Sequence, residues 1–397
     1  MLHKYAFSNF QSFRDRTEVS WQPDRKVPNE AWTAPSAAGG ERLSTIMAVI
    51  GANASGKTGL LKALIFMNWF MGDSFRDSQQ SMVRLFPHAA SEGAPSEFEK
   101  EFDFEGQLWR YELRATLSRV LHEALYVKKQ RMGYVFIRTW NDAEKTYEVK
   151  QQNLGFSPSE AVKVRPNASL ISTAAQYGVP LAQKIAQEAV RMNCNINEMG
   201  KALADRSVLQ LSAQHFLDNP VQREQMVDLL SKWDLGLRNV LIKKIDGTLT
   251  DGSPSSVLVP YGVHKMRNGD GFEVPFTFES SGTQGAFVLL ANLLSALAKG
   301  GLAVIDELEN DLHPHMLEPI LDLFANKDTN PHGAQLLFTC HAVQVLNMLH
   351  KSQVTLVEKD EHNESRAWRL GDMQGVRNDD NLYGKYMAGA YGATPYL

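Results

Sequence analysis

The chain reads Ile46-Met47-Ala48-Val49-Ile50-Gly51-Ala52-Asn53-Ala54-Ser55-Gly56-Lys57-Thr58 at the point that decides its fold. The apolar run 46–50 is typical of a buried strand, and residues 60–71 are apolar at helical spacing. The glycine-rich turn between them fits a phosphate-binding loop, in which backbone N–H groups surround the phosphates at the positive end of a helix. We expect the Lys57 amine to meet phosphate oxygens and Thr58 to reach Mg²⁺. The predicted nucleotide contacts in this loop are Gly51, Asn53, Ala54, Ser55, Gly56, Lys57 and Thr58.

Two carboxylates, Asp306 and Glu307, follow the apolar run 302–305. After a buried strand, one carboxylate can hold Mg²⁺ and the next can orient the attacking water. We assign Asp306 to the metal together with Thr58, and Glu307 to the water. Without the phosphate loop, the same pair would indicate an ordinary helix start.

Two further stretches complete the pattern. The apolar strand 335–339 is followed by His341, which is placed to hydrogen-bond the γ-phosphate. Residues 279–284 open a helix expected over 283–298, and their small side chains leave backbone N–H groups accessible to an anion. Alone, this second stretch would be a serine-capped helix start. Its predicted nucleotide contacts are Ser281, Gly282 and Gln284.

The rest of the chain predicts an α/β protein in three segments. Residues 1–156 form an N-terminal lobe with an opening hairpin, the phosphate loop and an antiparallel meander over 98–149. Residues 157–240 form a helical insertion, patterned over 181–192 and 221–233. Residues 241–397 form a C-terminal lobe with strands near 256–263 and 272–278, the 279–284 stretch, the acidic pair and His341.

Composition limits the function classes. The chain has 397 residues, 43% of them hydrophobic, and a net charge of −4, so it has no overall basic character favouring non-specific nucleic-acid binding. Its two cysteines do not suggest a disulfide framework, and the apolar runs are too short for a membrane span. These features predict a soluble cytoplasmic protein, with nucleic acid as a possible but unsupported partner.

The order of these motifs resembles an ABC-type ATPase of the Rad50, SMC and RecF kind. Four stretches resemble more narrowly the AAA15 group related to OLD-family and abortive-infection proteins: residues 7–13, 51–58, 306–314 and 383–396. The resemblance implies an ABC-type P-loop ATPase head with an antiparallel β subdomain and an inserted helical subdomain. It also implies ATP and Mg²⁺ as cofactors, His341 as the switch histidine, and residues 281–284 as a variant signature motif. In such heads, ATP lies between the phosphate loop of one copy and the signature motif of another, which predicts a homodimer or higher homo-oligomer.

This sequence departs from that pattern in places. Ser280 and Thr283 replace the leucine and second glycine of the usual signature motif, and Gln11 replaces a basic residue frequent in the opening motif. The Q-loop glutamine has three candidates, Gln79, Gln80 and Gln107, and Asp311 is a candidate within a D-loop expected at 309–312.

The resemblance implies a sensor or regulator ATPase of an anti-phage, abortive-infection system. Because the chain ends soon after the ATPase core, we expect a separate effector protein, a nuclease or toxin. One alternative is a RecF- or Rad50-like repair ATPase, which needs a basic surface; the short basic clusters lie at 128–131 and 243–244. Another is an ATP-gated scaffold with little turnover, against which an intact Glu307 argues.

Overall fold

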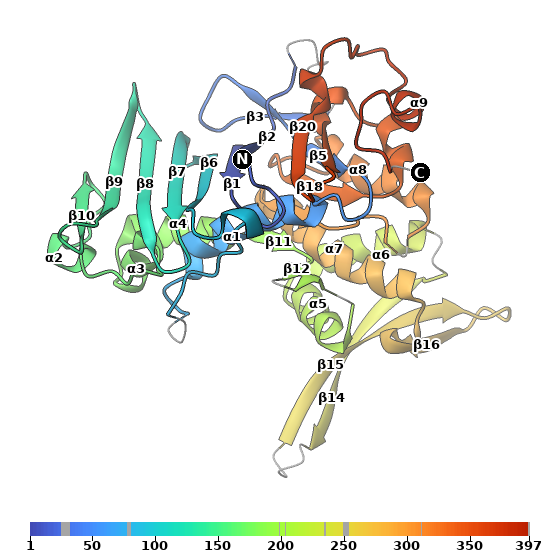
Figure 1. Ribbon diagram of the computed structural model, residues 1–397. Coiled ribbons are helices and arrows are strands. Elements are labelled where there is room, and N and C mark those ends of the chain that lie inside the picture. Colours follow the sequence, from blue (N-terminus) through green and yellow to red (C-terminus); the bar gives the residue numbers. More distant parts are fainter. Residues whose placement is uncertain are drawn as a thin grey trace.

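The computed structural model describes residues 1–24, 32–77, 81–197, 199–202, 204–233, 236–248, 254–310 and 312–395. Two large sheets with helices packed on them form the body of the molecule, and a three-stranded arm projects from it (Figure 1). Gln79, Gln80, Asp311 and Tyr396 lie outside the described residues.

The first sheet is antiparallel and has seven strands in the order β10-β9-β8-β7-β6-β1-β2. Strand β1 pairs with both β2 and β6, so the opening hairpin and the meander form one sheet. This confirms both predictions. The strands are β1 (Leu2–Ser8), β2 (Thr17–Ser20), β6 (Ser96–Phe104), β7 (Gln107–Ala115), β8 (Val120–Lys128), β9 (Met132–Asn141) and β10 (Thr146–Gln151).

The second sheet carries the predicted motifs. Its six strands run in the order β11-β17-β18-β5-β19-β20, parallel from β11 to β19, with β20 antiparallel at one edge. Since parallel strands end at the same edge of a sheet, the segments that follow β5, β17 and β18 meet there. The strands are β5 (Ile46–Ile50), β11 (Met192–Cys194), β17 (Leu302–Ile305), β18 (Gln335–Cys340), β19 (Val354–Lys359) and β20 (Ser365–Arg369).

Helices cover both faces of this second sheet, which explains why its central strands β5, β17 and β18 are largely apolar and buried. Side chains of a strand alternate between faces. Accordingly, Met47 and Val49 join the core around α1 (Lys57–Asp73). Ile46, Ala48 and Ile50 join the core around α7 (Ser281–Lys299) and α8 (Leu317–Ala325). Judged by length and composition alone, helix α7 could cross a membrane. However, 61% of its apolar stretch is buried inside the protein.

The predicted insertion 157–240 is divided between the two cores. Helices α3 and α4 contribute side chains to the core around α1, whereas α5 and α6 contribute to the core around α7. The segment also contains β11 and a small hairpin of β12 (Ile196–Asn197) and β13 (Gly200–Lys201), which the sequence did not predict. Its helices are α2 (Pro158–Ala161), α3 (Leu170–Gln176), α4 (Pro180–Val190), α5 (Arg206–Asp218) and α6 (Pro220–Lys232). The segment limits themselves stay a prediction.

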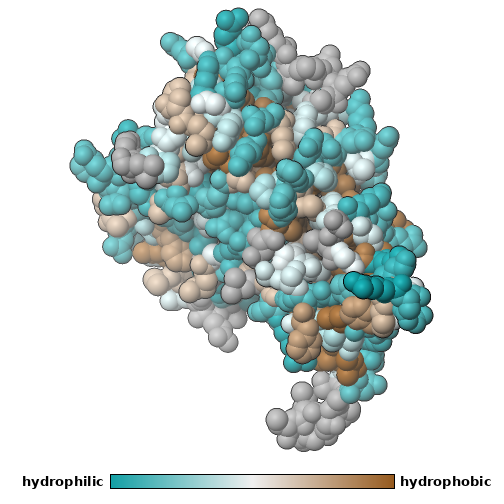
Figure 2. Space-filling model, turned by 90° about the vertical axis from the view of Figure 1, so that its right-hand side faces the viewer, coloured by the Kyte–Doolittle hydropathy of each residue, from teal (hydrophilic) through white to brown (hydrophobic). Residues whose placement is uncertain are grey.

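The arm consists of β14 (Asn239–Thr248), β15 (Pro254–Lys265) and β16 (Gly271–Pro275), and it leads through a 3₁₀ turn, η2 (Phe276–Phe278), into α7. Apolar side chains gather on the lower part of the face in Figure 2, over the arm. Large exposed apolar residues on the arm and the turn after it are Ile245, Met266, Phe272 and Phe278.

The remaining elements join or border these layers. They are β3 (Thr33–Pro35), β4 (Arg42–Ser44), α9 (Leu382–Met387) and the 3₁₀ turns η1 (Ala89–Ser91), η3 (Pro314–Met316), η4 (Val343–Asn347), η5 (Lys351–Gln353) and η6 (Leu370–Asp372). The architecture confirms the predicted α/β class with an antiparallel β subdomain.

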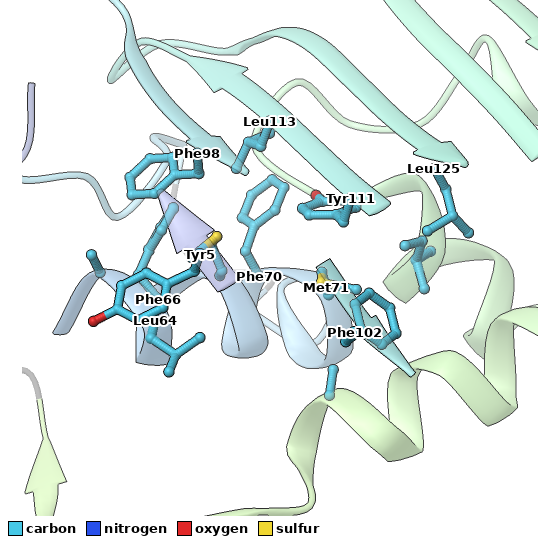
Figure 3. Packing of buried hydrophobic residues seen from close by; sticks show 14 of the residues in the cluster. Tyr5, Leu64, Phe66, Phe70, Met71, Phe98, Phe102, Tyr111, Leu113 and Leu125 are labelled. Atoms are coloured by element: carbon cyan, nitrogen blue, oxygen red, sulfur yellow. The ribbon is translucent and has the colours of Figure 1, made fainter. Parts of the chain in front are cut away.

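Aromatic side chains fill the space between the antiparallel sheet and α1 (Figure 3). Phe66 and Phe70 on α1 point at the sheet, and the Phe66 and Phe98 rings lie 4.9 Å apart. Each fully buried ring of this kind contributes roughly 1.5–3 kcal/mol of transfer free energy. This packing fixes α1, and with it the loop at its N-terminus, against a large rigid surface.

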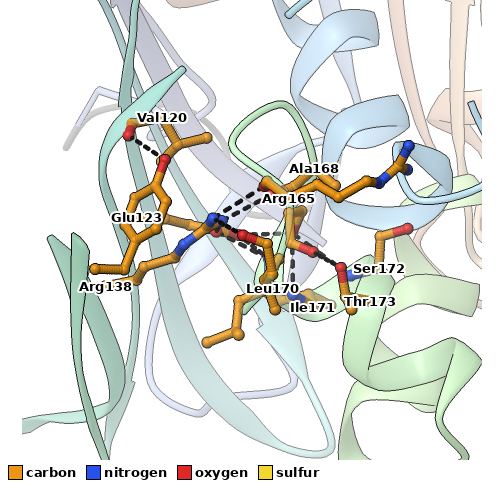
Figure 4. A network of polar contacts seen from close by, with 12 residues as sticks. Val120, Glu123, Arg138, Arg165, Ala168, Leu170, Ile171, Ser172 and Thr173 are labelled. Atoms are coloured by element: carbon orange, nitrogen blue, oxygen red, sulfur yellow. Dashed lines mark hydrogen bonds and ion pairs between the residues drawn. The ribbon is translucent and has the colours of Figure 1, made fainter. Parts of the chain in front are cut away.

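A buried ion pair, Arg138 with Glu123, connects the antiparallel sheet to the segment before α3 (Figure 4). Arg138 donates to the carbonyl oxygens of Val164 and Ala168, both at 2.8 Å. Glu123 accepts from the backbone N–H of Leu170 at the start of α3. Both charged side chains are fully buried, so each depends on these partners.

We expect Arg138→Met to lower the free energy of unfolding by about 3–5 kcal/mol, because the buried Glu123 charge loses its cationic partner Arg138 and the carbonyl groups of Val164 and Ala168 lose their donor. Chemical denaturation measures this change. The control is Arg114→Met, which breaks an exposed pair with Glu97 on the same sheet and should cost about 1 kcal/mol or less. Equal effects of the two substitutions would contradict a stabilising role for the buried pair.

Candidate nucleotide site

The phosphate loop joins β5 to α1 as predicted, and two of its glycines are sterically required. A Cβ atom on Gly51 would lie 2.0 Å from the Val357 carbonyl oxygen of β19. Gly56 has a φ of 112°, and a Cβ there would lie 2.5 Å from Ser365 Oγ. The Ser365 hydroxyl in turn donates to the Ser55 carbonyl at 2.6 Å. Strands β19 and β20 therefore hold the loop in its curved conformation.

The Lys57 amine folds back over the loop. Its Nζ donates to the carbonyl oxygens of Gly51 and Ala52, each at 2.9 Å. Burial lowers the pKa of Lys57, and the charges of Asp306 and Glu307 only partly offset this effect. The amine thus lies on the concave side of the loop, where phosphate oxygens are expected to bind.

Thr58 and Asp306, predicted as the magnesium ligands, are in direct contact. Thr58 Oγ1 donates to Asp306 Oδ2 at 2.9 Å, and Thr339 Oγ1 donates to Asp306 Oδ1 at 2.6 Å. Asp306 is buried, so these hydroxyl groups fix the plane of its carboxylate. The described residues contain no cluster of three or more acidic, histidine or cysteine side chains for a metal. A hydroxyl next to a carboxylate nevertheless fits Mg²⁺, which takes few protein ligands when phosphate oxygens and water supply the others.

The Asn195 side chain binds the backbone of Asp306. The Asp306 N–H donates to Asn195 Oδ1 at 2.7 Å, and Asn195 Nδ2 donates to the Asp306 carbonyl oxygen at 2.9 Å. Asn195 directly follows β11, which pairs in parallel with β17. Asn195 and Thr339 were not predicted as site residues, because nothing in the local sequence marks them out.

Glu307 lies between two basic side chains. Its Oε2 is 3.2 Å from Lys201 Nζ, and its Oε1 is 3.6 Å from His341 Nε2. Burial acts to raise the pKa of Glu307, but Lys201 and His341 outweigh it and the net pKa is lowered. Glu307 has a φ of 51°, a left-handed conformation that is uncommon for this residue type.

His341 directly follows β18, and its backbone N–H donates to Glu309 Oε1. It lines a cleft of about 1040 Å³ together with the phosphate loop and the C-terminal residues 386–389 and 393–395. The N–H of Ala393 donates to Glu358 Oε2 at 2.9 Å, which holds the C-terminal segment against the sheet. Phosphate loop, acidic pair and histidine therefore meet at one end of the sheet.

The predicted signature residues Ser281, Gly282 and Gln284 lie apart from this group, at the start of α7. The Ser280 hydroxyl caps the helix by accepting from the N–H of Thr283. Ser281 is exposed, and no hydrogen bond or salt bridge among the described residues joins 281–284 to the loop. Within one chain, the structure does not bring the signature motif to the phosphate loop.

Two glutamines that the sequence analysis singled out, Gln107 and Gln11, have clear positions in the structure. Gln107 begins β7 and lines a separate depression with Trp109 and Arg131, so it has no position at the loop. The Gln11 side chain lies near the first turn of α1, since a Cβ on Gly59 would come within 2.9 Å of its Oε1.

The fold and the grouped motifs define a P-loop nucleotide-binding ATPase domain. A family model described as "AAA domain, putative AbiEii toxin, Type IV TA system" matches residues 46–347, which include the phosphate loop, the signature motif, the acidic pair and His341. The chain belongs to this family.

Two solved structures are similar to the chain. One is the SMC head bound to the C-winged helix domain of ScpA, with 13% identity and a TM-score of 0.47 over 92% of this chain and 96% of that one. The other is the SMC head domain from Thermotoga maritima, with 12% identity and a TM-score of 0.41 over 93% and 98%. A search of curated proteins gave no match.

Proposed function

We propose that this chain is a Mg²⁺-dependent ATPase that acts in the cytoplasm as a sensor or regulator of a prokaryotic anti-phage defence system. The observation that carries the ATPase proposal is the direct contact of Thr58 with Asp306 beside Lys57, with Glu307 next in the chain. Thr58 and Asp306 would hold Mg²⁺, which neutralises phosphate charge. Lys57 binds the phosphate oxygens, Glu307 orients the attacking water, and His341 contacts the γ-phosphate.

We further propose that the complete site forms between two copies of the chain. The exposed start of α7 presents the backbone N–H groups of a helix N-terminus and the positive end of the helix dipole, which suits a phosphate bound by another copy. The Phe278 side chain, 80% exposed just before the signature motif, adds apolar surface suited to association. ATP binding then closes a dimer or higher homo-oligomer, and hydrolysis opens it.

The defence role draws on the family description, which names an AbiEii toxin and a type IV toxin–antitoxin system. The sequence resemblance to abortive-infection ATPases supports the same role. In this proposal, a separate nuclease or toxin is the effector protein. A DNA-repair role has less support, because the basic cluster at 243–244 is partly neutralised: Lys243 pairs with Glu273 and lies over the Tyr261 ring.

The Lys57 side chain provides the first test. We expect Lys57→Ala to raise the Kd for ATP roughly 30-fold or more in calorimetric titration, because a buried charge-assisted contact with the phosphates is removed. The control Lys184→Ala removes an exposed lysine of α4 and should leave the Kd unchanged. An unchanged Kd in Lys57→Ala would overturn the assignment of the loop.

The same variant tests the defence role in cells that carry the chain with its neighbouring genes. Wild-type protection against phage that is lost in Lys57→Ala supports an ATP-dependent sensor. Absence of protection by the wild type would refute the defence role while leaving the nucleotide site intact.

A further inference from the structure

Lys201 makes two contacts with one residue of the acidic pair. Its Nζ lies 3.2 Å from Glu307 Oε2 and 3.4 Å from the Glu307 carbonyl oxygen. Only 19% of the lysine side chain is exposed and 39% of the glutamate side chain, so the pair is partly buried. Lysine 201 comes from the hairpin β12–β13, 106 positions before Glu307 in the chain.

The backbone fixes where Lys201 lies. Strand β11 pairs with β17 in parallel register, Met192 opposite Leu302 and Cys194 opposite Val304. Asn195 then binds the Asp306 backbone through two hydrogen bonds, and the N–H of Ala202 donates back to the Asn195 carbonyl at 2.7 Å. The segment that begins with β11 aligns strand β17, which precedes the acidic pair. The same segment therefore places Lys201 beside Glu307.

The two oxygens of the Glu307 carboxylate have different neighbours. Oε2 faces Lys201, whereas Oε1 faces His341, which lines the cleft beside the phosphate loop. Binding of Oε2 by Lys201 limits rotation of the partly exposed carboxylate and keeps Oε1 directed toward His341. A carboxylate that must orient a water molecule needs such a fixed plane.

We propose that Lys201 is a positioning residue for ATP hydrolysis, which holds the Glu307 carboxylate in the orientation that presents Oε1 to the attacking water. This inference rests on the proposed ATPase function. Lys201 acts here through Glu307, so its expected effect is on turnover and not on ATP binding.

Steady-state kinetics of Lys201→Met tests the inference. We expect kcat to fall about 10- to 100-fold, as for a misplaced reacting group, with KM changed less than about threefold. Lys201→Arg keeps the charge and the donors and should restore kcat to within about fivefold of the wild type. Lys299→Met, at the exposed far end of α7, is the control and should keep wild-type kinetics.

A double substitution shows whether Lys201 acts through Glu307. In single-turnover experiments, adding Lys201→Met to Glu307→Gln should cause no further loss, because the carboxylate that Lys201 holds is already absent. A further loss equal to that of the single variant overturns the inference, as does a kcat within twofold of wild type for Lys201→Met. Failure of Lys201→Arg to recover activity in a folded protein also overturns it. If the wild type itself does not hydrolyse ATP, the proposed function fails first and the inference falls with it.

Discussion

Glu307→Gln is expected to reduce ATP turnover by at least about 100-fold while ATP still binds. The substitution keeps the size of the side chain but removes the charge that orients and polarises the attacking water, an effect commonly worth 10²–10⁴ in rate. Lys57, Thr58 and Asp306 are unchanged, so the contacts to phosphates and magnesium should persist. Phosphate release measures turnover, and calorimetry measures binding.

The same variant should accumulate an ATP-bound assembly. If ATP closes two copies and hydrolysis opens them, blocking hydrolysis shifts the population to the closed state. Light scattering with and without ATP detects this change in mass. The control is Glu318→Gln, which neutralises an exposed carboxylate of α8 and should behave like the wild type. Wild-type turnover by Glu307→Gln would show that another residue orients the water.

The motifs that the sequence predicted are those encoded in short continuous stretches. The apolar run of β5, the glycines and Lys57 lie within 13 residues, and the steric need for Gly51 and Gly56 explains why the loop is so recognisable. The acidic pair and His341 follow strands that are apolar on both faces, so their place at one sheet edge follows from parallel topology.

The residues that the sequence missed come from a distant, short segment. Strand β11 has only three residues, each half-buried, and it lies between helices, so no apolar run reveals it. Asn195 reaches Asp306, and Lys201 reaches Glu307, because β11 pairs with β17. Thr339 was read as part of a buried strand, although its hydroxyl binds Asp306.

For the signature motif, the local sequence predicted the local structure but not the binding partner. Its local sequence predicts a capped helix start, which the structure has, with Ser280 as the N-cap. In the proposed assembly, the phosphate loop that it faces is set by how copies of the chain associate, which its local sequence does not encode. The shared site is therefore the central claim that needs its own experiment.

Mixing two inactive variants tests this claim most directly. Lys57→Ala disables the phosphate loop, and Ser281→Arg places bulk and charge at the signature motif, so each protein alone should be inactive. In a mixed dimer, one composite site carries both defects and the other carries none. Random exchange of subunits should then restore roughly a quarter of wild-type ATPase activity, since half of the dimers are mixed and each holds one intact site.

Before the mixture is measured, circular dichroism must show that both variants are folded, and native mass spectrometry must show that mixed dimers form. Restored phosphate release in the mixture, absent from either variant alone, is the result that the account predicts. Verified mixed dimers with no more activity than the two separate variants would contradict a site shared between copies.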